Sequence, residues 1–123
     1  MRVKQLATIL FYLMFIYSGV NKIFTFNKKV TVLANKTGLP NYINVLGMIG
    51  VIILEILGSL ILIINSFDNK IIDKKIIKFT NMLFLLFLIV VTLLYHPPNK
   101  KIIPFLSNLT TFSGILYMYG DLI

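Results

Sequence analysis

The chain contains no cysteine among its 123 residues, which excludes disulfides, iron–sulfur clusters, thiolate metal sites and dithiol redox cycles within it. Tryptophan is also absent. Histidine occurs once, at His96, so haem ligation by two histidines and multi-histidine metal sites are excluded as well. We therefore expect no metal, no haem and no covalently bound cofactor.

Charged residues are scarce, and acidic residues are the scarcest. Asp and Glu number 4 against 12 Lys and Arg, while apolar residues make up 58% of the chain and the mean hydropathy is +0.90. A soluble domain of this length has too little interior to bury so much apolar surface, because small domains are mostly surface. The composition therefore predicts a membrane protein whose first partner is the lipid bilayer.

The net charge of +8 does not indicate a nucleic-acid partner. The basic residues lie at the ends of apolar runs, as at Arg2 and Lys4 and at Lys28 and Lys29. In such positions lysine side chains reach lipid headgroups. We predict no binding to nucleic acid.

Four apolar runs are long enough to cross a bilayer, which takes about 20 helical residues. They cover roughly residues 5–26, 42–65, 78–96 and 104–122, and none alternates with the period of a barrel strand. The sequence thus predicts an all-α fold, a four-helix transmembrane bundle that forms a single domain over residues 1–123. The first run also has the basic start and apolar core of a signal peptide, but it is long and lacks a clear cleavage site.

The connections between these runs carry their own signals. Between the first two runs we expect a short interfacial helix that stops at Gly38 and Pro40. Pro97 and Pro98 should end the third run, and Pro104 suits the first turn of the fourth. Each run is therefore a separate helix.

Four spans would place both termini on the same side of the membrane. Six basic residues then fall on each side, so the positive-inside rule gives no orientation on the full count. Leaving out Lys22, on the interpretation that it lies within the membrane, favours cytoplasmic termini.

Glu55 lies near the middle of the second run, where a charge is costly and normally faces the bundle interior with a partner. Gly58 and Ser59 share its face, and Gly47 is expected to continue that face two turns earlier. Such small residues allow helices to pack closely. Two interpretations stay open: a protonated Glu55 that only donates an interhelical hydrogen bond, or a proton acceptor or polar anchor for a ligand.

Lys22 lies one turn after Ser18 at the end of the first run, next to Gly19. It either extends to the headgroups or turns inward, with Ser18, into a network with Glu55. A paired lysine would keep Glu55 ionised, whereas burial alone favours the neutral carboxyl group.

His96 ends the third run and shares a face with Thr92. It either caps the last carbonyls of its helix or exchanges protons at the mouth of a pocket. The fourth run carries a stripe of small, polar or flexible residues at three- and four-residue steps, predicted to face inward as packing contacts or as a pocket wall. Its members are Ser107, Asn108, Thr111, Gly114 and Met118.

Five segments stand out together, namely LFYLMFIYSGVNKI, TGLP, LEILGSLILII, TLLYHPP and FLSNLTTFSGILYMYG. In order and spacing they resemble the DoxX family of small four-helix membrane proteins, over nearly the whole chain. The residues that carry the likeness are Gly19, Lys22, Gly38, Pro40, Glu55, Gly58, His96, Asn108 and Gly114. No catalytic residue is carried over from it.

The resemblance implies a subunit or accessory of a membrane oxidoreductase system, since the family is named for a subunit linked to quinone-dependent thiosulfate oxidation. We expect a polar-lined pocket for a small lipophilic ligand such as a quinone, and oxidoreductase subunits as partners. Glu55 and Lys22 would supply proton or hydrogen-bond partners, His96 a route to the surface, and Asn108 and Thr111 the pocket wall. The chain would then be a non-autonomous subunit.

Two other functions stay open. One is a small proton-coupled transporter resembling the small multidrug exporters, although those carry their glutamate in the first helix and use tryptophan. The other is a non-catalytic scaffold or assembly subunit. The sequence also leaves open whether the chain forms a homo-oligomer.

Overall fold

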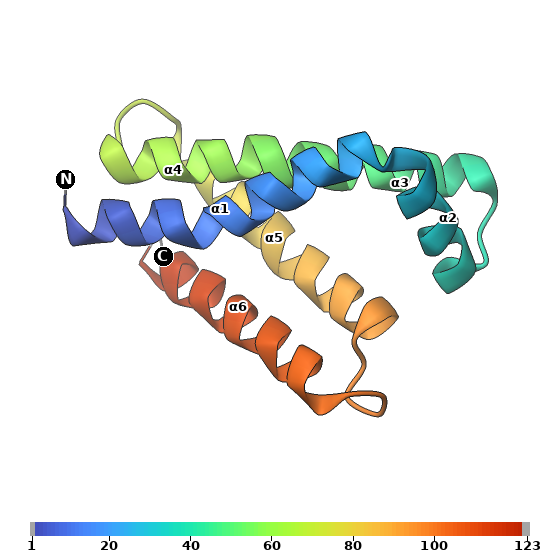
Figure 1. Ribbon diagram of the computed structural model, residues 1–123. Helices are drawn as coiled ribbons and strands as arrows, with labels where there is room; N and C mark the ends of the chain where they lie inside the picture. The colour runs from blue at the N-terminus through green and yellow to red at the C-terminus, as the bar shows by residue number, and fades with distance from the viewer. Residues whose placement is uncertain (1, 122–123) are drawn as a thin grey trace. The chain divides into compact units, whose positions relative to one another are not determined.

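The computed structural model describes residues 2–121, whose regular secondary structure is entirely helical (Figure 1). The elements in chain order are α1 (Val3–Phe24), α2 (Phe26–Thr37), α3 (Asn41–Ile53), the π-helix η1 (Leu54–Gly58), α4 (Ser59–Phe67), α5 (Lys74–Tyr95) and α6 (Ile102–Gly120). The prediction of an all-α fold is confirmed. The chain divides into two compact units, Met1–Asp73 and Lys74–Ile123.

Within the described residues, three helices are long and apolar enough to cross a membrane by length and composition. They are Val3–Phe24, Asn41–Phe67 and Lys74–Tyr95, which match the first three predicted spans. The fourth predicted span coincides with α6, which has 19 residues but is not among the three. Membrane-spanning helices are thus supported, while the count of four is not confirmed.

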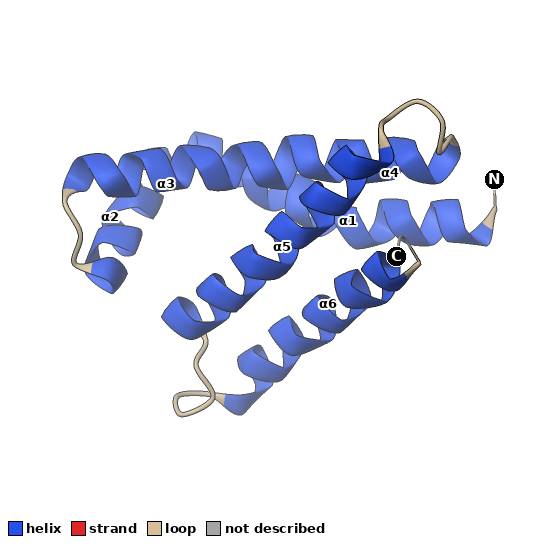
Figure 2. Ribbon diagram, turned by 180° about the vertical axis from the view of Figure 1, so that it is seen from behind, coloured by secondary structure: helices blue, strands red, loops and turns tan. Residues whose placement is uncertain are grey.

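In the first unit, α1 lies antiparallel beside a continuous long helix that α3, η1 and α4 form together (Figures 1 and 2). The side of α1 that is buried carries Tyr12, Phe15 and Gly19, spaced by three and four residues. Leucines on its other sides, such as Leu10 and Leu13, are exposed. A helix that is apolar on all sides suits a lipid environment.

The long helix buries one face, on which Glu55 lies between Met48 and Ser59. The burial of Gly58 and Ser59 agrees with the predicted packing face. Gly47 is exposed, and the prediction that it continues this face is wrong. A helix returns to the same side after about seven residues, and Gly47 precedes Glu55 by eight, so Met48 takes that position instead.

α2 follows α1 after a single interrupting residue. Thr25 has φ −118° and ψ 33°, and both its N–H and its hydroxyl donate to the Asn21 carbonyl, at 3.0 and 2.9 Å. α2 ends at Gly38, whose φ of 68° is readily adopted only by glycine. The prediction of a helix between the first two runs that stops at Gly38 is confirmed.

Asn44 ties the end of α2 to the start of α3. It is 2% exposed. Thr37 Oγ1 donates to its side-chain oxygen at 2.7 Å, and its Nδ2 donates to the carbonyls of Leu39 and Pro40 at 2.9 and 3.2 Å. These bonds hold the turn between the two helices in one conformation.

The second unit is a hairpin in which α5 and α6 lie side by side (Figures 1 and 2). α5 ends at Tyr95, just before Pro97 and Pro98, and α6 has Pro104 in its first turn, as predicted. The positions of these prolines therefore set the length of the connecting loop.

Candidate functional site

Glu55 forms a buried ion pair in the first unit. Lys22 Nζ lies 2.6 Å from Glu55 Oε1 and also donates to Ser18 Oγ at 2.7 Å. The side chains of Lys22 and Glu55 are 18% and 3% exposed. The inward orientation of Lys22 and its contact with Glu55 are confirmed. We call Ser18, Lys22 and Glu55 the ion-pair cluster.

Gly19 lets the two backbones approach closely enough for this pair. A Cβ atom on Gly19 would lie 2.6 Å from Ile56 Cγ1 and 3.3 Å from Glu55 Cβ, so a larger residue would push the helices apart. The prediction of Gly19 as a helix-packing residue is confirmed. Glu55 itself lies in η1, a single π-helical turn of the kind that is frequent at functional sites.

The opposite charges of Lys22 and Glu55 balance each other within the ion-pair cluster. Each charge taken out of water is costly, and the short charge-assisted hydrogen bond offsets that cost only while both partners are present. The ammonium group has three donors, of which Ser18 and Glu55 accept two. The cluster can therefore hold a charge in an apolar environment and offer one more donor to a ligand or a water molecule.

Among the other buried polar side chains, Ser59 and Asn81 lie within candidate membrane helices. Ser59 is 0% exposed, and its hydroxyl has no hydrogen-bond partner in the described part of the chain. Asn81 in α5 is 2% exposed and donates to the Ile77 carbonyl at 3.1 Å. Sequence reasoning missed Asn81, although a single amide within the apolar run from Phe79 to Val91 was a signal that could have found it.

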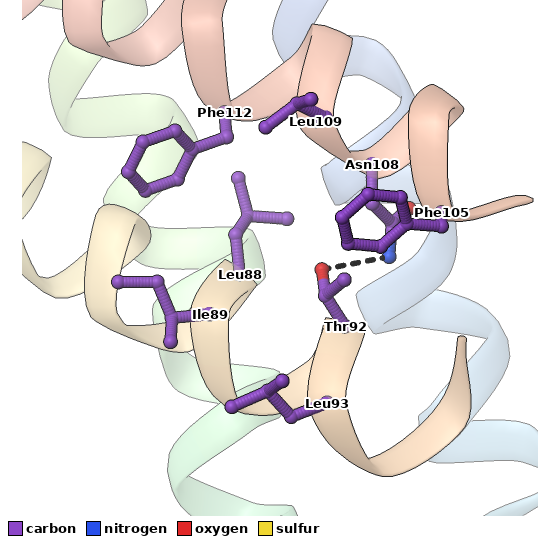
Figure 3. Close-up of a pocket in the computed structure, with 8 residues that line it drawn as sticks. All are labelled: Leu88, Ile89, Thr92, Leu93, Phe105, Asn108, Leu109 and Phe112. Atoms are coloured by element: carbon purple, nitrogen blue, oxygen red, sulfur yellow. Dashed lines mark hydrogen bonds between the residues drawn. The ribbon is translucent and has the colours of Figure 1, made fainter. Parts of the chain in front are cut away.

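A cavity of about 180 Å³ lies between α5 and α6 in the second unit (Figure 3). Most of its lining is apolar, and the one polar contact inside it joins Asn108 Nδ2 to Thr92 Oγ1 at 3.2 Å. The lining residues are Leu88, Ile89, Thr92, Leu93, Phe105, Asn108, Leu109 and Phe112. We call this cavity the α5–α6 pocket.

The size and lining of the α5–α6 pocket suit a single ring. An apolar cavity of about 150 Å³ is enough to hold benzene. Besides the bond to Thr92, the Asn108 amide has a second N–H and a carbonyl oxygen, and Thr92 has a hydroxyl proton. The polar groups nearest to such a ring are those of Asn108 and Thr92, which contribute very little of the pocket surface.

The other predicted residues of the second unit lie apart from this pocket lining. His96 is exposed, its backbone N–H donates to the Thr92 carbonyl at 2.9 Å, and its ring centroid lies 6.5 Å from that of Tyr95. Thr111 donates to the Ser107 carbonyl in its own helix at 3.3 Å. Thr111 is predicted to form part of the pocket wall, but it is not among the observed lining residues.

The predicted inward stripe of α6 is observed in part. Asn108, Thr111, Gly114 and Met118 are half-buried, whereas Ser107 is exposed and Ile115 is fully buried. Ile115 follows Asn108 by seven residues, or about two helical turns, which places both on one face. Asn108 belongs to the second unit, and the expectation that it lines one pocket with Glu55 and Lys22 stays a prediction.

Comparisons of the chain with protein-family models, with curated proteins and with solved structures find no match. No family is shown. The function must be inferred from the ion-pair cluster and the α5–α6 pocket themselves.

Proposed function

We propose that this chain is an integral membrane protein that binds the ring of a small lipophilic molecule, such as a quinone, in the α5–α6 pocket. The observation that carries the proposal is the Asn108–Thr92 hydrogen bond inside an otherwise apolar cavity of about 180 Å³. Small-molecule sites combine apolar walls with a few polar groups that fix the orientation of the ligand. Here the walls would hold the ring and the amide would bind its carbonyl oxygen.

The rim of the pocket supports entry from lipid. Ile89, Leu93 and Leu109 line the cavity and are 44%, 63% and 46% exposed. In a hairpin that crosses a bilayer, such side chains meet acyl chains rather than water. A quinone fits this arrangement because its planar head carries carbonyl acceptors while its long apolar tail can stay in the lipid.

The proposal includes α6 as a fourth membrane span. Its 19 residues correspond to about 28 Å of helix, close to the thickness of the hydrocarbon core. Three of its hydroxyls donate to carbonyls one turn earlier in the same helix, which lowers the cost of placing them in lipid. They are the hydroxyls of Thr110, Thr111 and Ser113.

The role that we propose is an accessory subunit, DoxX-like in its sequence motifs, that holds a quinone beside a membrane oxidoreductase. The chain has no cysteine and one histidine, so the electrons would come from a redox centre in the partner. What this chain contributes is a ring-sized site and a hydrogen bond to the quinone oxygen.

The test is saturable binding of a radiolabelled short-tailed benzoquinone to the full chain in lipid nanodiscs. Asn108→Leu keeps the approximate size of the side chain but removes the amide, and we expect about a tenfold weaker affinity from the loss of one hydrogen bond. Thr110→Val removes a hydroxyl from the exposed side of the same helix and is the matched control. Absence of saturable binding would contradict the proposal.

The ion-pair cluster favours a second candidate, a proton-coupled transporter. A carboxylate buried within a candidate membrane helix is a common element of proton pathways. This function predicts proton-driven substrate flux in liposomes, and its loss in Glu55→Gln. Unchanged flux in that variant would contradict it.

A further inference from the structure

α2 is a continuous helix whose end is anchored to α3, and it is therefore a defined surface rather than a loose loop. At its start, the Lys29 N–H donates to the Thr25 carbonyl at 3.0 Å. At its end, the Gly38 N–H donates to the Ala34 carbonyl at 2.9 Å, and Thr37 is bonded to the buried Asn44. The side chains of α2 are thus presented in a fixed arrangement.

The two faces of α2 differ in chemistry. Val30 is 5% exposed, and Leu33 Cδ2 lies 4.0 Å from the position of a Cβ on Gly47, so this face packs on the long helix. The opposite face is exposed and carries hydroxyl, amide and lysine side chains with one valine. Its residues are Asn27, Lys28, Thr31, Val32, Asn35 and Lys36.

The positive charge of this segment has no acidic counterpart nearby in the sequence. Residues 1–54 contain no Asp or Glu, and Glu55 is paired with Lys22. The next acidic residue, Asp68, lies about 20 Å beyond Glu55 along the long helix, and α2 begins about 8 Å from Glu55 in the opposite direction, so the two are about 28 Å apart along the axis. That distance exceeds the screening length of about 8 Å in physiological salt several-fold, so Asp68 does not neutralise Lys28 and Lys29.

The geometry of the first unit places α2 at the level of the membrane surface. Gly19 of α1 is level with Glu55 of the long helix. From this level α1 continues for about 8 Å to its end at Phe24, and the long helix extends about 21 Å in the same direction to its start at Asn41. α2 packs on α3, which extends beyond the end of α1. With Glu55 at the midplane, the hydrocarbon core ends about 15 Å away, within the range that α2 covers.

The flanks of α2 fit the same position. Phe24 is 82% exposed just before it, and Leu39 and Tyr42 are 49% and 67% exposed just after it. Exposed aromatic and apolar residues on either side of a basic helix are typical of segments that lie in the headgroup layer. α2 thus combines apolar anchors with the exposed Lys28 and the half-buried Lys29, whose long side chain can extend to the headgroups.

We propose that α2 is a binding surface for acidic phospholipids, with Lys28 and Lys29 contacting the phosphate groups. This site is separate from the α5–α6 pocket and does not depend on the ligand proposed for it. Each lysine near an anionic surface contributes about a fivefold gain in affinity. Loss of both should weaken the binding of acidic lipid on the order of 20-fold.

The test titrates the delipidated full chain in detergent with phosphatidylglycerol or phosphatidylcholine and counts retained lipids by native mass spectrometry. We expect the wild type to retain phosphatidylglycerol over phosphatidylcholine, and Lys28→Gln/Lys29→Gln to lose that preference. Lys70→Gln/Lys100→Gln removes the same charge from two exposed loop positions and should keep it. Lys28→Arg/Lys29→Arg should also keep it.

Equal retention of both lipids by the wild type would overturn the proposal, as would an equal loss in the loop variant. Lys28 and Lys29 are exposed and half-buried, respectively, so helical circular dichroism should be unchanged in the glutamine variant. If the arginine variant fails to bind while its helicity is intact, positive charge at these positions is not what the lipid recognises, and the proposal is wrong.

Discussion

Lys22 of α1 and Glu55 of the long helix are joined by a 2.6 Å ion pair whose carboxylate side is 3% exposed. The pair links the two longest elements of the first unit at the level where Gly19 brings their backbones together. Opposite charges in an apolar environment depend on each other, because either one alone is costly to bury.

The first prediction concerns this dependence. Lys22→Met should lower the free energy of unfolding by about 3–5 kcal/mol, since it leaves a buried carboxylate unpaired. Glu55→Gln should keep the fold at a smaller cost, because the amide oxygen still accepts from Lys22, whose side chain is 18% exposed. Glu55→Lys should disrupt the fold by placing two ammonium groups together. Denaturant titrations in detergent micelles measure these differences, and equal tolerance of both Glu55 variants would place the side chain in water.

Gly19 provides the second prediction. Gly19→Ala should destabilise the fold by about 1–3 kcal/mol through overpacking, since its Cβ would lie 2.6 Å from Ile56 Cγ1. The cost should shrink in the background of Ile56→Ala, which removes the clashing atom. Gly50→Ala is the control, because no atom lies within 4 Å of its Cβ position; similar losses at Gly19 and Gly50 would contradict the close approach.

Gly38 tests backbone conformation rather than packing. No atom lies within 4 Å of a Cβ on Gly38, but its φ is +68°. Gly38→Ala should therefore cost about 1–2 kcal/mol, and Gly38→Asn less, because asparagine tolerates this conformation. Thermal unfolding of the two variants gives the comparison, and a more stable alanine variant would show that the left-handed turn is absent.

Membrane topology distinguishes three spans from four. If α6 crosses the bilayer, reporters fused to the two termini should report the same compartment. If only Val3–Phe24, Asn41–Phe67 and Lys74–Tyr95 cross it, the reporters should fall on opposite sides. The fusions thus test the fourth span of the proposed function directly.

The helices could be predicted closely because long apolar runs bounded by proline, glycine and charge leave few alternatives. The third predicted span, residues 78–96, differs from Lys74–Tyr95 by four residues at its start, where lysines still form helix. The partnership of Lys22 with Glu55 was also accessible, since a midplane carboxylate needs a partner. Whether Lys22 would extend to the headgroups instead depended on the position of α1 along the long helix, which no local pattern specifies.

Other features depended on tertiary structure. The π-helical turn at Glu55 and the break at Thr25 have no sequence signature comparable to proline or glycine. Spacing predicts Gly47 on the buried face, but Met48 takes that position, and a difference of one residue rotates a side chain by about 100° around the helix. Spacing alone predicts an inward Ser107, whereas the packed face of α6 carries Asn108 and Ile115.

The most direct measurement of the central claim is photo-crosslinking of an azido-benzoquinone to the full chain in nanodiscs, with the labelled peptides identified by mass spectrometry. Binding in the α5–α6 pocket predicts labelling within residues 88–93 and 105–112, abolished by excess unlabelled quinone and weakened in Asn108→Leu. Labelling confined to α1 and the long helix, or spread evenly over all helices and insensitive to competition, would contradict the claim.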